Sequence, residues 1–160
     1  MIDVVNSFKK YGITRTDLLN DIITALSTTK VYLRDQFPNN ISESSECPSH
    51  CPIFGLSDPN PEKVKRKDVF YYKGSCSHTH TKICQFCAQI KDTFEVIEEL
   101  IHSHQAVTGD FQFNKNKFKS SKAMEKIFAY QKHLMAAYVQ QREWSTLQEK
   151  YLPNQAFVTV

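Results

Sequence analysis

The sequence is poor in glycine and has no long apolar run. Only 4 of its 160 residues are glycine, which argues against a sandwich or propeller built from many tight turns. No apolar stretch approaches the roughly 18–20 residues that a bilayer-crossing helix needs. The opening residues, MIDVVNSFKKYG, lack the apolar core of a secretory signal. We therefore expect an intracellular protein with no membrane partner, whose thiols stay reduced.

Cysteine is also scarce, and it is unevenly placed. The chain has 5 cysteines, an odd number that suits a disulfide framework poorly. They lie in two clusters, CPSHC (47–51) and CSHTHTKICQFC (76–87), and the second cluster holds no carboxylate. Thiols clustered with histidines in a reducing compartment indicate metal binding. The candidate ligands are Cys47, His50, Cys51, Cys76, His78, His80, Cys84 and Cys87.

The spacing of the cysteine pairs predicts one all-thiolate site. Cys84 and Cys87 are three apart where a helix should begin, so they share one face of its first turn, and the positive helix end favours their thiolate forms. Cys47 and Cys51 can supply the second pair. Four thiolates match a tetrahedral Zn²⁺.

The remaining four ligands predict a second site. Cys76, His78 and His80 alternate, so on an extended segment their side chains share a face, and His50 would complete the set. A single zinc is the rival hypothesis. It would use Cys47 or Cys51 with the other three cysteines, and the histidines would then be loop residues or hydrogen-bond partners of the ligands.

The sequence favours a structural rather than a catalytic role for one or two Zn²⁺ ions. A catalytic zinc keeps an open position and a nearby carboxylate base, whereas here the ligands can fill every position. The nearest acids, Asp58, Glu62 and Asp68, form no metalloprotease-like motif. The segment also lacks apolar periodicity, so burial alone would not fold it. We assign no catalytic residue.

Apolar spacing elsewhere predicts a mainly α fold with a small zinc-stabilised module. We expect N-terminal helical segments ending at Gly12 and at Pro38, and a helix over about 81–106 followed by a loop. A second long helix over about 121–151 should pack on the first as an antiparallel hairpin. Residues 30–37 are compatible with strand or helix, and we favour helix. The resulting division is 1–40 helical, 41–88 zinc module, 89–152 hairpin and 153–160 the start of a strand.

Single residues add little to this division. We expect His102 and His104 to interact with the carbonyl end of their helix. We expect Trp144 to pack between helices.

Two basic clusters suggest nucleic acid as a partner. The net charge of +3 is too small to establish this, but lysine-rich loops supply the phosphate contacts that DNA binding requires. The candidate residues are Lys63, Lys65, Arg66, Lys67, Lys115, Lys117 and Lys119. The competing interpretation of each cluster is a solvated loop.

The motifs CPSHCPIFGLSDP, CSHTHTKICQFC and YQKHLMAAYVQQ resemble a family of metazoan, mobile-element-derived, transposase-like proteins. In that family a C-x2-HC segment and a C-x-H-x-H-x3-C-x2-C segment precede a long helix and an RNase H-like core. The resemblance covers roughly 31–160 and implies that all eight cysteines and histidines above bind metal. It also implies that AFVTV (156–160) begins the core, whose acidic residues would follow.

These observations lead to three functional hypotheses. The first is a zinc-stabilised, non-catalytic DNA-binding region of a nuclear, transposase-like protein. The alternative is a zinc-bearing protein–protein interaction module that forms homo-oligomers through the helical hairpin. The third is a zinc-dependent hydrolase or nuclease that uses the histidine-rich site.

Overall fold

The computed structural model describes residues 2–10, 16–57 and 76–151, and within these ranges every regular secondary-structure element is a helix. This confirms the mainly α fold class. In chain order the elements are α1 (Ile2–Lys10), α2 (Thr16–Val31), the π-helical turn η1 (Tyr32–Gln36), α3 (Phe37–Asn40), α4 (Pro52–Leu56), α5 (Gln85–Ser103) and α6 (Gln105–Tyr151).

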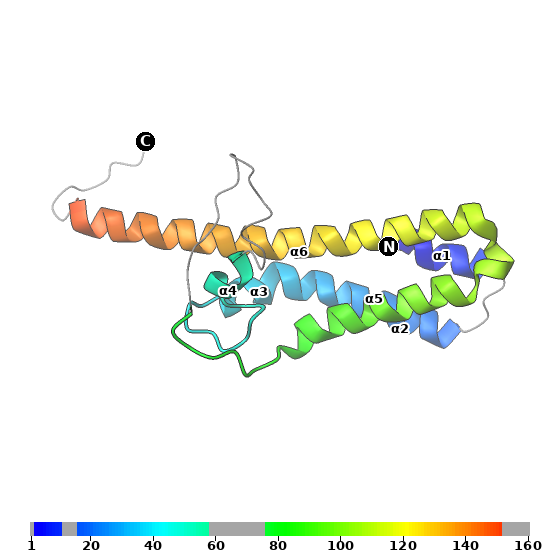
Figure 1. Ribbon diagram of the computed structural model, residues 1–160, viewed down its shortest axis with the longest axis horizontal. Helices are drawn as coiled ribbons and strands as arrows, with labels where there is room; N and C mark the ends of the chain where they lie inside the picture. Colours follow the sequence, from blue (N-terminus) through cyan, green and yellow to red (C-terminus); the bar gives the residue numbers. More distant parts are fainter. Residues whose placement is uncertain (1, 11–15, 58–75, 152–160) are drawn as a thin grey trace.

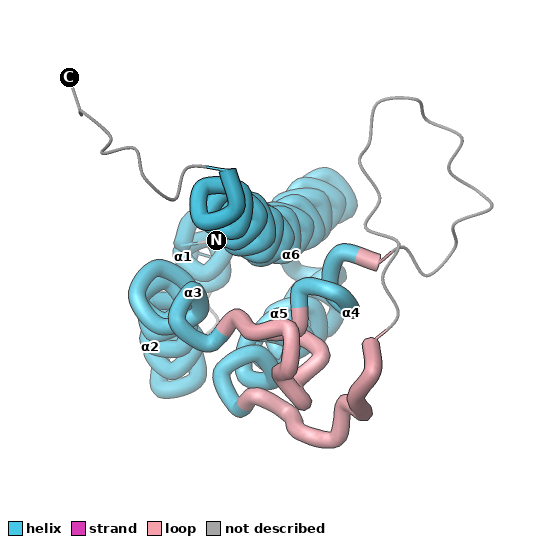
Figure 2. Tube along the Cα trace, turned by 90° about the vertical axis from the view of Figure 1, so that its left-hand side faces the viewer, coloured by secondary structure: helices cyan, strands magenta, loops and turns pink. Residues whose placement is uncertain are grey.

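The helices form an elongated bundle around one long hairpin. Helices α5 and α6 run antiparallel, as expected, and α2 packs against α5 (Figures 1 and 2). Helix α1 packs at the end where the hairpin turns. The loops that carry the cysteines and histidines lie toward the other end, beside α3 and α4. The last turns of α6 extend beyond the rest of the bundle (Figure 1).

Two apolar clusters hold the bundle together. The first joins α1, α2, α5 and the start of α6 through buried residues such as Phe8, Leu19 and Ile97. The second lies next to the loops and includes Phe37 and Phe94. This second cluster also contains the thiol of Cys87. The candidate metal site is therefore built directly onto the bundle core.

The expected loop between the two long helices is mostly helix. Helix α6 begins at Gln105 and is kinked at Gly109, whose φ of 73° and ψ of 159° lie in a region that only glycine adopts readily. Beyond the kink, Phe113, Asn116 and Ser120 are buried at helical spacing. The amide of Asn116 donates to the hydroxyl of Ser7 on α1 at 3.1 Å. The sequence pattern missed this face because two of its three buried side chains are polar.

Pro38 does not end the N-terminal helical segment, contrary to expectation. The chain continues from α2 through η1 into α3, where Pro38 lies in the first turn. A proline is tolerated in a first turn because its missing N–H would have no helical partner there. The segment ends at Ile41, whose backbone is extended. Residues 30–37 are helical, as favoured over a strand.

Several expectations concern single residues or particular segments. The Nδ1 atom of His104 is 3.0 Å from the carbonyl of Leu100, which confirms its interaction with the end of α5. Trp144 is 61% exposed, so its expected packing between helices is wrong. Among the described helices, none is long and apolar enough to cross a membrane. The basic cluster 63–67 and the expected strand 153–160 lie outside the described residues. The four-part division of the chain stays a prediction.

Candidate metal centre

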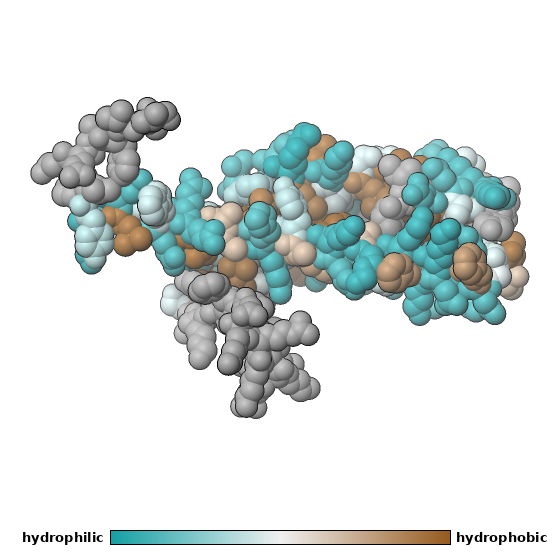
Figure 3. Space-filling view, turned by 90° about the horizontal axis from the view of Figure 1, so that it is seen from above, coloured by the Kyte–Doolittle hydropathy of each residue, from teal (hydrophilic) through white to brown (hydrophobic). Residues whose placement is uncertain are grey.

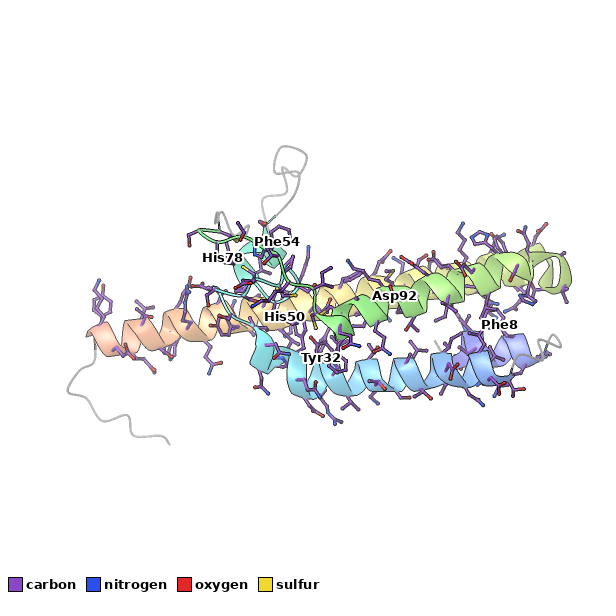
Figure 4. All side chains as sticks on the ribbon, turned by 90° about the horizontal axis from the view of Figure 1, so that it is seen from below. Phe8, Tyr32, His50, Phe54, His78 and Asp92 are labelled. Carbon is purple, nitrogen blue, oxygen red and sulfur yellow. The ribbon has the colours of Figure 1, made fainter. Side chains whose placement is uncertain are left out.

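The two cysteine-bearing segments lie side by side although they are far apart in sequence. The amide of Lys82 donates to the carbonyl of Glu46 at 3.2 Å, and the side chains of these two residues form an exposed ion pair. The Nε2 atom of His78 is 2.9 Å from the carbonyl of Ser45. These contacts align residues 41–51 with residues 76–84. Figure 4 shows His50 and His78 in this region and Phe8 far away in the bundle.

The first ligand group consists of Cys51, Cys76, His78 and His80. One ligand atom from each residue lies within 4.8 Å of the others, and the sulfurs of the two cysteines are 3.6 Å apart. Two thiols and two imidazoles form a donor set typical of structural zinc. The four residues come from both segments, so an ion bound here would crosslink them.

The histidines of this first group are arranged as metal ligands usually are. The Nε2 atom of His80 is buried and has no hydrogen-bond partner, which is costly unless a ligand occupies it. The Nε2–H of His78 can donate to the Ser45 carbonyl, which leaves Nδ1 free to bind a metal. The ring of His80 also packs against Phe54 at a centroid distance of 4.6 Å. These residues therefore fit a metal ion.

The second ligand group consists of His50, Cys84 and Cys87, again with ligand atoms within 4.8 Å of one another. It lies at the start of α5, where Cys84 is the N-cap and Cys87 is in the first turn. Sulfur of Cys87 and Nε2 of His50 are 3.6 Å apart. The hydroxyl of Tyr32, the first residue of η1, is next to all three.

The surroundings of the second group adjust the pKa values of its members. Burial lowers the pKa of His50, which keeps the imidazole in the neutral form that binds metals. Burial raises the pKa of Cys87 to about 11. Burial by itself raises the pKa of Cys84. Hydrogen bonds from the Tyr32 hydroxyl and from backbone N–H groups at the start of α5 outweigh this effect, so the net result is a lowered pKa. Gln131 on α6 also donates to the Cys87 sulfur at 3.8 Å.

The structure divides the candidate ligands differently from the sequence analysis. We expected His50 to join the group of Cys76, and Cys51 to join the cysteine pair at the start of α5. In the structure Cys51 is in the group of Cys76, and His50 is with the pair at the start of α5. Cys51 has an extended backbone, with φ of −84° and ψ of 111°. His50 is the last residue of the preceding turn, and the adjacent residues 50 and 51 serve different groups.

Cys47 belongs to neither group. Its carbonyl accepts hydrogen bonds from the amides of His50 and Cys51, at 3.0 and 3.1 Å. Its side chain is 8% exposed and lines a cavity of about 280 Å³ together with Cys84 and Cys87. It shapes the tight turn that presents the two neighbouring ligands, and its assignment as a ligand stays a prediction.

The basic residues of the sequence analysis do not all share a surface. Lys115, Lys119, Lys122 and Lys126 follow one another at spacings of four, three and four residues, which places them on one face of α6. In this set, which we call the lysine stripe, Lys115, Lys122 and Lys126 are exposed and Lys119 is half-buried. Lys117 projects elsewhere, with its ammonium group 5.9 Å from the centre of the Phe113 ring.

Two members of the lysine stripe were not among the predicted nucleic-acid contacts. We expected Lys115 and Lys119 in a loop, and Lys122 and Lys126 in the helix that follows it. The helical spacing that all four lysines share was therefore not recognised. Seen from the α6 side, the molecule shows many hydrophilic side chains interrupted by scattered apolar ones (Figure 3). Helical spacing counted across 110–126 would have revealed the stripe.

Comparison with known proteins identifies no relative of this chain. No family model matches it, and neither the curated proteins nor the solved structures contain a significant match.

Proposed function

We propose that the chain is a zinc-stabilised, non-catalytic nucleic-acid-binding region that holds two Zn²⁺ ions. Seven cysteine and histidine side chains gathered into two compact groups support metal binding. Zinc is the proposed ion because thiolate and imidazole donors in tetrahedral sets select it among the abundant divalent cations. In this proposal the ions replace the apolar core that the loops lack, and the helices carry the binding surface.

The observation that carries nucleic-acid binding is the lysine stripe of α6. Its four ammonium groups are spread over about 16 Å of helix, at 1.5 Å per residue. Lys119 and Lys122 have exposed acidic neighbours, Asp3 and Glu125, and such surface ion pairs are weak enough to exchange for phosphate. Repeated cations on one face of a straight helix suit the regularly spaced phosphates of a nucleic-acid backbone.

A matched pair of charge reversals tests the stripe. Lys115→Glu should weaken binding to a DNA duplex several-fold. It should also reduce the slope of log Kobs against log[salt] by about 1, because it removes a phosphate contact. Lys117→Glu changes the net charge equally on the same helix but off the stripe, and should change binding little. Fluorescence anisotropy at several salt concentrations measures both. Equal effects of the two variants would show that binding depends on the overall charge of the protein and not on the stripe.

The resemblance in metal-ligand spacing supports a further part of the proposal, a transposase-like parent protein acting in the nucleus on DNA. A metal-stiffened helical region of this kind would position DNA for a catalytic domain elsewhere. The cluster Lys63, Lys65, Arg66 and Lys67 would supply phosphate contacts in addition to those of α6.

A second candidate function, self-association, is favoured by the projecting end of α6. Trp144, Leu147 and Tyr151 recur at helical spacing on this end and are 61%, 49% and 64% exposed. If they form a contact between copies, sedimentation should show a dimer that resists high salt, because apolar contacts are not screened. Trp144→Ser should then return the protein to monomer. A monomer at all concentrations would argue against this candidate.

A further inference from the structure

The second ligand group has three members, whereas a closed structural zinc site needs four. Cys47 is the neighbouring thiol, but its sulfur is not part of the group. A different atom is much better placed. The hydroxyl oxygen of Tyr32 lies 2.7 Å from Nε2 of His50, 3.2 Å from sulfur of Cys84 and 3.5 Å from sulfur of Cys87.

These separations resemble those of four donors around one ion. With bonds near 2.0–2.3 Å, neighbouring donors of a tetrahedral ion lie roughly 3.3–3.8 Å apart. The two oxygen–sulfur distances of 3.2 and 3.5 Å and the nitrogen–sulfur distance of 3.6 Å are close to this range. The oxygen–nitrogen distance of 2.7 Å is clearly shorter than this range. A small shift of one side chain would therefore complete the tetrahedron.

The phenol ring of Tyr32 is held in this position from several sides. It is 1% exposed. It stacks on Phe86, with ring centroids 4.7 Å apart and planes inclined by 16°, and it meets the ring of Phe37 edge-on. The residue opens the π-helical turn η1, and such turns are frequent at functional sites. The hydroxyl is thus fixed beside the three ligand atoms by packing as well as by hydrogen bonds.

The geometry points to the Tyr32 hydroxyl, and not the Cys47 thiol, as the fourth protein donor of the second centre. This inference rests on the proposed metal binding and adds an oxygen ligand to it. The ion would then crosslink η1, residue 50 and the start of α5, and so fasten the N-terminal helices to the metal-bearing loops. Cys47 would contribute only through its backbone.

Zinc titration of the full chain under reducing conditions, after removal of metal by a chelator, tests this inference. The wild-type protein should bind two Zn²⁺, release the phenolic proton of Tyr32 to the buffer, and develop the near-ultraviolet difference band of a metal-bound tyrosinate. Tyr32→Phe keeps the stacked ring and removes the oxygen. It should lose that band and weaken one of the two Zn²⁺ sites by at least about 10–100-fold, the loss typical when a supporting group of a metal site is removed. Cys47→Ala should keep both the band and the affinity.

The competing outcomes are distinct. Loss of one zinc site in Cys47→Ala with unchanged affinity in Tyr32→Phe would make Cys47 the ligand and overturn the inference. Absence of the tyrosine band in the wild-type protein, where folding of a variant plays no part, would also overturn it. Absence of any zinc binding would instead overturn the proposed function itself.

Discussion

Cys51→Ala should release one metal ion per chain and unfold the loops 41–57 and 76–84, while the far end of the bundle stays folded. The first ligand group draws its members from both loops, so loss of one thiolate opens the crosslink between residue 51 and residues 76–80, while the second ion still joins His50 to the start of α5. Structural zinc contributes about 10–16 kcal/mol to the folding of zinc-finger peptides. We therefore expect the loops to lose at least about 3 kcal/mol of stability, in the range seen when a metal site is lost.

Hydrogen exchange resolved by segment, together with metal analysis, measures this effect. Amides of the loops should lose protection, whereas those of α1 and of α5 near Ile97 should keep it, because they belong to the first apolar cluster. Cys47→Ala is the matched control, since it removes a buried thiol of the same turn that lies outside both ligand groups. Unchanged protection of the loops in Cys51→Ala would contradict a structural role for the first ion.

Phe37→Ala should destabilise the whole bundle by about 3–5 kcal/mol, as expected for a large aromatic side chain removed from a core. Phe37 is fully buried. Its ring meets those of Tyr32 and His50 edge-on, at centroid distances of 6.0 and 5.3 Å. Its loss should therefore also weaken metal binding at the second centre, because the ligand ring would no longer be held in place.

Denaturant unfolding of the metal-loaded protein, followed by circular dichroism, measures the effect. Phe111→Ala is the control: the same chemical change on α6 at a side chain that is 82% exposed should alter stability by no more than about 0.5 kcal/mol. A loss below about 1 kcal/mol for Phe37→Ala would show that the second apolar cluster does not support the metal centre.

The sequence was sufficient for the fold class because the main helices follow a simple apolar rule. Ile90, Phe94, Ile97 and Ile101 recur at spacings of three and four and are all buried on α5. The hairpin followed, since neither long helix can bury its stripe alone. The same rule failed for the start of α6, where Asn116 and Ser120 occupy buried positions that hydropathy treats as exposed.

The metal ligands were recognisable by residue type, but their grouping was not. Spacing alone favoured joining residues of like chemistry, and so it placed Cys51 with Cys84 and Cys87. The grouping depends on the change from the turn at His50 to the extended backbone of Cys51, which ligand spacing alone does not indicate. Tyr32 was not predicted because its position beside the ligands depends on η1, and nothing in a stretch such as KVYLRDQF indicates a π-helical turn.

The most direct test of the account is the number of metal ions in the purified chain and the effect of their removal. Native mass spectrometry of protein prepared under reducing conditions should show two Zn²⁺ per chain. A strong chelator should remove both and lower the melting temperature, with loss of structure in the loops. A protein that carries no metal, and whose fold and melting temperature are unaffected by the chelator, would contradict the claim that coordination holds these loops in shape.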